Sequence, residues 1–194
     1  MGGSGPLPEN GVVVATDAEL RELVSEIRRD GAELPPVGLL GGDLCRTLGG
    51  RGDTARLGTA EATRVTVDIG SVLMDGRLHW FCAHLVAGSL AWGRVWVAAI
   101  AAHHGRWNLA PRAHPGDGLL DVLDATLSLG DRLVAKRRLA AGYHVPHPRI
   151  DYRRTAAHQI DFPGPTRIRL DHEKVGSARR VSVRVEAAAL RVVV

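Results

Sequence analysis

Apolar and polar residues alternate with a period of two along much of the chain beyond residue 61. Val181, Val183 and Val185 point one way and their polar neighbours the other, and the same alternation runs over 65–69. Successive side chains of a strand point to opposite faces of a sheet, so this period indicates strands with one buried face. The pattern therefore predicts a β-rich domain over 61–194.

Turn signals divide this domain into separate elements. Asp75-Gly76 lies between the apolar runs 72–74 and 78–85, which is typical of a two-residue hairpin turn. Apolar residues from Trp92 to Ile100 recur at helical spacing and predict a helix over 91–104. A second helix is expected over 129–139. Further strands are expected at 119–127, 156–160, 167–170, 181–185 and 190–194.

The first sixty residues follow a different pattern. A flexible leader over 1–10, rich in Gly and Pro, precedes two apolar runs at 12–15 and 37–40. Between the runs, Thr16 and Glu19 have the spacing of a capping box that opens an amphipathic helix. The segment 11–60 therefore predicts a strand–helix–strand unit followed by a glycine-rich linker. One such unit cannot cover both faces of a parallel sheet, so it must pack on the rest of the chain.

Composition narrows the class of protein. The chain has 194 residues, is 45% hydrophobic and carries a net charge of +4, with nearly all basic residues arginine. This charge suits phosphate ligands or an anionic membrane surface, and we expect no nucleic-acid partner. Two isolated cysteines, Cys45 and Cys82, fit a reducing cytosol. The longest apolar stretch, 95–102, is far short of the roughly 20 residues of a membrane helix, so a cytoplasmic protein is expected.

Carboxylates beside glycine form the first candidate site. Asp171 and Glu173 stand two residues apart where an expected strand ends. Two such carboxylates can project into one cleft, where one orients a cation and the other accepts a proton from a hydroxyl. The alternative is an ordinary hairpin turn, in which Asp, Glu and Gly are common.

A second candidate site lies in the loop before the expected strand 119–127. His114, Asp117 and the backbone of Leu119 occupy a tight loop punctuated by glycine. Carboxylate and carbonyl oxygens suit a hard cation such as Mg²⁺. The alternative is again a turn, since Pro, Gly and Asp are the usual turn residues.

Structural or surface roles are expected for the histidine pairs and for the basic cluster. His103-His104 and His144-x-x-His147 lack a nearby cysteine or a metalloprotease-type helix motif, so structural or surface roles are expected rather than zinc binding. The basic cluster Lys136–Arg138 predicts a solvated helix face, with contact to anionic lipid headgroups as the alternative.

The two carboxylate segments together resemble the bacterial diacylglycerol kinase family, which shares a fold with NAD kinases. The family motif P-x-A-x-x-x-D-G-x-L-x-V is matched by residues 111–122, and the later D-G-E motif by Asp171 and Glu173, with His172 in place of Gly. The lead-in at 105–111, the strand at 65–70 and the loop at 141–147 are also similar to family segments, in the same order. The resemblance covers roughly 61–194.

The resemblance implies a fold and a chemistry. The fold would be α+β: a sandwich-like, β-rich C-terminal lobe with a short N-terminal βαβ remnant of the nucleotide-binding lobe over 11–60. Glu173 would accept the proton of a lipid hydroxyl, and Asp171 would support it or help to hold catalytic Mg²⁺. His114, Asp117 and Leu119 would form a structural Mg²⁺ site. The reaction would transfer the γ-phosphoryl group of ATP to a lipid alcohol.

The chain departs from the family where nucleotide should bind. The family phosphate loop reads G-G-D-G-T, but residues 15–19 keep only Asp17 and lack every glycine. Glycines allow a backbone to approach phosphate closely, and Glu19 adds a negative charge there. A second family loop is shortened to residues 41–43, where Asp43 remains. Asp17 and Asp43 are the residues that the resemblance assigns to the nucleotide.

Two classes of function follow. The first is a lipid kinase, completed by a homodimer or a partner kinase chain and associated peripherally with the inner membrane face. The second is a non-catalytic relative that binds a lipid or a phosphorylated small molecule, or regulates a full-length kinase. The loss of the phosphate loop favours the second class.

Overall fold

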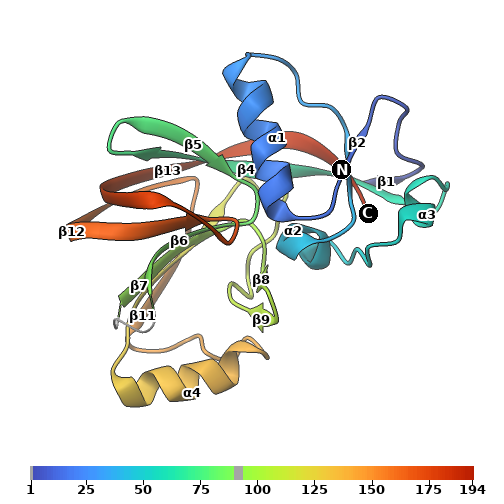
Figure 1. Cartoon of the computed structure of the whole chain (residues 1–194). Coiled ribbons are helices and arrows are strands. Elements are labelled where there is room, and N and C mark those ends of the chain that lie inside the picture. The colour runs from blue at the N-terminus through green and yellow to red at the C-terminus, as the bar shows by residue number, and fades with distance from the viewer. Residues whose placement is uncertain (1, 90–93) are drawn as a thin grey trace.

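The computed structural model describes residues 2–89 and 94–194, except for the side chain of Lys136. A long curved sheet forms the body of the molecule, and helices lie at its two ends (Figure 1). The helices of the described residues are α1 (Asp17–Arg29), α2 (Gly42–Thr47), α3 (Thr54–Leu57) and α4 (Leu129–Leu139).

Seventeen elements follow one another along the described chain, of which thirteen are strands. The strands of the N-terminal half are β1 (Gly3–Ser4), β2 (Val12–Val14), β3 (Val37–Leu39), β4 (Thr63–Met74), β5 (Arg77–Phe81), β6 (His84–Ser89) and β7 (Arg94–Ala99). Those of the C-terminal half are β8 (His103–His104), β9 (Trp107–Asn108), β10 (Leu120–Thr126), β11 (Ile150–Thr155), β12 (Ala157–Leu170) and β13 (Glu173–Val193).

Most strands of the main sheet pair antiparallel. Its order is β1-β4-β13-β12-β6-β7-β10-β11, with β5 on β4, and β2 and β3 joined to the end of β13. Among the described residues, β2 pairs parallel with β3, β3 pairs parallel with β13, and the other strand pairs are antiparallel. The strand–helix–strand pattern expected over 11–60 is therefore present, and its strands extend the same sheet.

The sheet curls around one apolar core. Inward side chains of β4, β5, β6, β7, β10, β12 and β13 meet in a single cluster, which includes the large rings of Trp96, Phe81 and Phe162. Strand β12 bends where its register with β13 shifts between Asp161 and Thr166. Pro163 and Pro165 lie in that interval and have no N–H to donate to a ladder. The bend lets distant strands face one another across the core.

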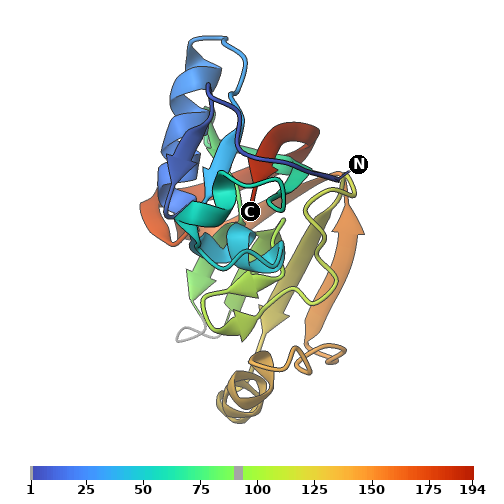
Figure 2. The ribbon, with the colours of Figure 1, turned by 90° about the vertical axis from the view of Figure 1, so that its right-hand side faces the viewer.

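A second core holds the N-terminal helices against the sheet. Leu20 and Val24 of α1 are buried with Leu44 of α2 and with residues of β4 and β13. The capping box predicted for α1 is confirmed, since the Thr16 hydroxyl accepts from the Glu19 N–H at 3.1 Å. Figure 2 shows α1 at one end of the molecule, α4 at the other and α2 between them.

The helix predicted over 91–104 is wrong for the part that the structure describes, and residues 91–93 lie outside it. Residues 94–99 form β7, which pairs with β6 and β10. Trp96 and Ala98 join the inner core, whereas Val97 and Ala99 join another cluster on the opposite face. A strand buried on both faces is a continuous apolar run, which periodicity alone does not distinguish from a buried helix.

Other predicted elements are longer or shorter than expected. The helix at 129–139 and the turn at Asp75-Gly76 are confirmed. The separate strands expected at 156–160 and 167–170 are parts of β12, and those at 181–185 and 190–194 lie mostly in β13. The run 78–85 divides between β5 and β6. No helix among the described residues is long and apolar enough to cross a membrane.

Gly70 of β4 tests the packing of the inner core. A Cβ at this position would overlap the ring of Phe81, which is fully buried and cannot move aside. We expect Gly70→Ala to lower the free energy of unfolding by about 1–3 kcal/mol, the usual cost of overpacking. Gly130→Ala is the matched control because its Cβ meets nothing within 4 Å. Urea unfolding of both variants measures the difference, and equal stabilities would contradict this packing.

Candidate functional site

The loop that precedes α1 is closed by its own side chains. The carboxylate of Glu19 accepts the N–H of Ala15 at 2.8 Å while Thr16 caps the helix. Helix N-termini bind anions through N–H groups that lack partners. Here the Glu19 carboxylate already accepts one such N–H group, at the position where the resemblance puts the phosphate loop.

Asp17 caps the next helix in the same way. Its carboxylate is buried and accepts the N–H groups of Asp43 and Leu44 in the first turn of α2. Gly42 has φ of +91°, and a Cβ there would collide with the Asp17 carboxylate, so glycine is required at this position. Burial raises the pKa of Asp17, against the two N–H donors that lower it. Asp17 therefore has a capping role in this arrangement.

Asp43 is the centre of a polar cluster of four residues, Asp43, His84, His104 and His172, which we call the Asp43 cluster. Asp43 and His84 are buried, His104 is half-buried and His172 is exposed. The Oδ2 of Asp43 lies 2.6 Å from Nε2 of His172, and 3.6 Å from Nδ1 of both His84 and His104. Its Oδ1 accepts the N–H of Gly105 at 2.7 Å. The rings of His104 and His172 stack at 4.2 Å, and those of His84 and His104 meet edge to face at 4.9 Å. Residues from α2, β6, β8 and the β12–β13 turn thus converge.

Protonation differs among the members of the Asp43 cluster. Burial, and then the neighbouring His104, lower the pKa of His84 to about 3. Burial and His172 lower the pKa of His104 to about 4. The hydrogen bond to Asp43 raises the pKa of His172. Burial opposes ionisation of Asp43, but that hydrogen bond and the nearby imidazoles outweigh it, so the pKa of Asp43 is lowered.

Asp171 and His172 form the two-residue turn between β12 and β13. Their φ angles are +48° and +71°, and Leu170 pairs with Glu173 across the turn. Two positive φ angles in succession are the geometry of a tight hairpin with the twist of its strands. The turn expected as the alternative at this segment is therefore present. A tight turn is compatible with a role in chemistry, because its fixed backbone also fixes the positions of the His172 and Glu173 side chains.

The Asp171 carboxylate is a structural clamp. It is buried and accepts the N–H groups of Cys82, Ala83 and His84 at 2.8–3.0 Å. Burial raises the pKa of Asp171 to about 7, and the three N–H donors counteract part of that shift. Cys82 and Ala83 connect β5 to β6 and His84 begins β6, so Asp171 holds the backbone that carries His84. It positions the Asp43 cluster.

Glu173 lies at the surface. Its side chain is 51% exposed and pairs with Arg21 of α1. The carboxylate that the resemblance assigns to proton transfer is thus reachable by a ligand, and a cationic group from the N-terminal unit lies against it. Asp171 and Glu173 differ fully in environment although they are two residues apart.

His114, Asp117 and Leu119 lie in a separate loop that packs on β4. Asp117 accepts the N–H of Leu119 at 3.0 Å and pairs with Arg154, and His114 Nδ1 accepts the N–H of Gly116 at 3.3 Å. A cation at Asp117 would have to displace the Arg154 guanidinium. The donor set as arranged does not fit Mg²⁺, and the Mg²⁺ site implied by the resemblance stays a prediction.

Asp68 holds this loop and was missed by the sequence analysis. Alternation places it on the polar face of β4, yet it is buried. Its carboxylate accepts the N–H groups of Gly118 and Ala188, both at 2.8 Å, and its own N–H donates to Pro115. An isolated acid in an otherwise apolar strand, VTVDIG, is the signal that could have identified it.

An apolar pocket of about 280 Å³ lies between the outer face of the sheet and α4. Its walls are mainly aliphatic side chains of β6, β7, β10 and α4. His104 of the Asp43 cluster and Arg169 of β12 also line it, so the pocket adjoins the cluster. Its aliphatic lining includes Val86, Val97, Leu109, Leu123, Ala125 and Leu139.

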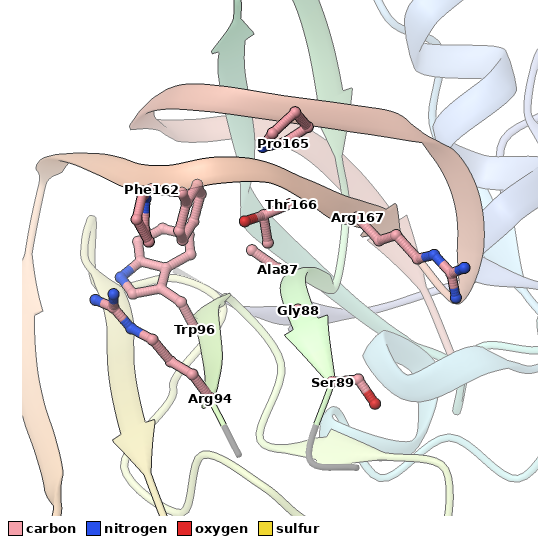
Figure 3. Close-up of a pocket in the computed structure, with 10 residues that line it drawn as sticks. Ala87, Gly88, Ser89, Arg94, Trp96, Phe162, Pro165, Thr166 and Arg167 are labelled. Atoms are coloured by element: carbon pink, nitrogen blue, oxygen red, sulfur yellow. The ribbon is translucent and has the colours of Figure 1, made fainter. Parts of the chain in front are cut away.

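A second pocket, of about 380 Å³, opens on the inner face of the same β6–β7 hairpin. Figure 3 shows the rings of Trp96 and Phe162 on one side of it and Arg167 on another. Residues of the hairpin alternate between the two pockets: Ala87 faces this one and Val86 the apolar one. No residue of the Asp43 cluster lines this pocket.

No protein-family model and no curated protein matches the sequence. Solved structures do match. A diacylglycerol kinase from Bacillus anthracis str. Sterne superimposes with a TM-score of 0.73 at 13% identity, over 94% of this chain and 75% of that chain. Two further structures from the same organism, assigned as diacylglycerol kinases, give 0.73 and 0.68 at 12% identity, over 94% of this chain and 77% of theirs. The chain therefore has the fold of the bacterial diacylglycerol kinases.

Proposed function

We propose that this chain binds a lipid, or a similar amphipathic alcohol, with its alkyl chain in the apolar pocket beneath α4. The observation that carries the proposal is the lining of that pocket, which is mostly aliphatic, with a few polar residues that include His104, His144 and Arg169. Ligand pockets combine an apolar wall with a few polar groups that fix orientation. A volume of about 280 Å³ suits one short alkyl chain, so one of the two chains of a diacylglycerol would occupy the pocket.

The outer surface of α4 supports access from a membrane. Leu129, Leu133 and Val134 are 76%, 66% and 45% exposed, and Arg137 and Arg138 are exposed beside them. An apolar helix face next to cations favours binding at an anionic membrane surface. The pocket lies directly beneath this helix, so a lipid would reach it from the membrane. Peripheral membrane association is therefore part of the proposal.

Phosphoryl transfer from ATP to the bound alcohol is the second candidate. The likeness to solved diacylglycerol kinases and the exposed carboxylate of Glu173 favour it. The segment 11–60 would then be a reduced nucleotide lobe of the NAD kinase-like fold. Against it, both loops where phosphates would bind are closed by Glu19 and Asp17. A lipid-binding role without transfer is therefore favoured for the single chain, and a partner chain or homodimer would be needed to rebuild the nucleotide site.

One titration tests lipid binding. Trp107 lines the apolar pocket, so dioctanoylglycerol should change the intrinsic fluorescence in a saturable way. The control is glycerol, which shares the polar head but has no alkyl chain. A response that is equal for both compounds, or that does not saturate, would refute the pocket assignment.

A second measurement separates binding from transfer. ATP with Mg²⁺ raises the melting temperature only if the folded chain binds it. We expect no shift at millimolar nucleotide for the single chain, and no phosphorylated product. If a shift and a product are observed, Glu173→Gln should abolish the product while the melting temperature changes little, because Glu173 is exposed.

A further inference from the structure

Two ring nitrogens of the Asp43 cluster, Nδ1 of His84 and Nδ1 of His104, lie near the Asp43 carboxylate without a hydrogen bond to it. The Nε2 of His84 lies 2.9 Å from the carbonyl oxygen of Ala101, so this nitrogen carries the proton and donates it. In neutral His84 the Nδ1 is therefore an unprotonated lone pair. His84 is fully buried, and its Nδ1 has no hydrogen-bond partner among the described residues.

The same lone pair points at a carboxylate. His84 Nδ1 lies 3.6 Å from Asp43 Oδ2, and His104 Nδ1 lies at the same distance from that oxygen. Both distances are too long for a hydrogen bond. The Nδ1 of His104 is likewise buried without a partner. Buried ring nitrogens that lack a partner are unfavourable, and a cation bound between them and the Asp43 carboxylate would supply one.

We propose that Asp43 Oδ2, His84 Nδ1 and His104 Nδ1 bind a Zn²⁺ ion. These three atoms lie within 4.8 Å of one another. Ligands about 2.1 Å from a tetrahedral zinc are separated by roughly 3.4 Å, close to the 3.6 Å of the two Asp43 distances. Only small side-chain shifts are needed.

The surroundings match those of zinc ligands. Zinc-binding histidines usually donate their second ring nitrogen to a carbonyl or carboxylate, as His84 does to Ala101. His172 hydrogen-bonds Asp43 and stacks on His104, so it orients two of the three ligands. The donor set of two imidazoles and one carboxylate suits zinc, whereas Mg²⁺ prefers oxygen ligands only.

The site has an entry route and one open position. The side chains of His84 and Asp43 are 0% and 7% exposed, whereas those of His104 and His172 are 20% and 48% exposed. An ion therefore enters from the side of the histidine stack. Three protein ligands leave a fourth position for water or a ligand oxygen, as in zinc sites that act on substrates. Asp17 is not a ligand, because its two oxygens cap α2.

Metal binding is tested on the untagged full chain, stripped with a chelator and without nucleotide. Zn²⁺ is titrated in competition with a chromophoric chelator, and Co²⁺ is followed by its visible absorption. We expect one Zn²⁺ per chain, a Co²⁺ spectrum of four-coordinate type, and no displacement by millimolar Mg²⁺. Absence of stoichiometric binding, or displacement by Mg²⁺, would overturn the proposal. Because nucleotide is absent, either result leaves the ATP question separate.

Adjacent histidines give a matched pair of variants. His104→Ala removes a ligand and should weaken Zn²⁺ binding more than about 100-fold. His103→Ala removes the neighbouring ring, which contacts Thr47 and not Asp43, and should leave the affinity unchanged. Zn²⁺ should raise the melting temperature of His103→Ala and not of His104→Ala. Equal loss in both variants, or no loss in His104→Ala, contradicts the ligand assignment.

Discussion

Replacing Asp171 with alanine is expected to lower the free energy of unfolding by about 3–5 kcal/mol, since each buried N–H left without a partner costs about 1–3 kcal/mol. The carboxylate accepts three backbone N–H groups in a region closed to water. Urea unfolding at constant pH measures the loss. The variant should also fail to bind Zn²⁺, because the same N–H groups hold the backbone of His84.

His172→Ala is the control for Asp171→Ala. The substitution changes the next residue of the same turn. The His172 side chain is 48% exposed and makes one hydrogen bond, from Nε2 to Asp43. We expect a loss of stability below about 1 kcal/mol, the usual value of one partly exposed hydrogen bond. If Asp171→Ala is as stable as the wild-type chain, the carboxylate is not the clamp described above and a direct role in binding becomes the better explanation.

Replacing Val86 with tryptophan is expected to block the apolar pocket. Val86 lies on β6, is half-buried and lines the pocket, so a larger ring there occupies the volume that an alkyl chain would fill. Each excluded methylene forfeits about 0.8 kcal/mol. Loss of three methylenes predicts roughly 50-fold weaker binding of dioctanoylglycerol. The fluorescence titration measures this affinity directly.

Leu78→Trp is the matched control for the pocket variant. Leu78 lies on β5, is 53% exposed and does not line the pocket. Its affinity for dioctanoylglycerol should equal that of the wild-type chain. Leu109→Trp provides a second block if Val86→Trp proves unstable, because Leu109 is half-buried and also lines the pocket. If all three variants bind dioctanoylglycerol with equal affinity, the lipid does not bind in the apolar pocket.

Elements that depend on local sequence chemistry were predictable from the sequence. The capping box at Thr16, the Asp75-Gly76 turn and the helix at 129–139 depend on local chemistry, and all are confirmed. The segment 94–100 was predicted wrongly because burial on both faces removes the alternation that marks a strand. Which strands pair over long distances, such as β13 with β4 or β12 with β6, does not follow from local patterns.

The candidate residues were only partly predictable. Asp171, His172 and Glu173 were recognised as a unit, but their separation into a clamp, a cluster member and an exposed carboxylate depends on what packs against each. Asp43 was recognised through the resemblance, whereas its contact with His84 and His104 was not. These three residues lie 41 and 20 positions apart, and no spacing rule links an acid on α2 to histidines on β6 and β8.

The sequence by itself determined the β-rich character of 61–194, the strand–helix–strand unit before it and the loss of glycines near Asp17, because period, caps and backbone freedom are local properties. The tertiary structure alone decided that Glu19 and Asp17 close the two loops, that α4 covers an apolar pocket, and that Asp43 meets His84 and His104. Those outcomes depend on burial and on distances between segments far apart along the chain, and the curled sheet sets both.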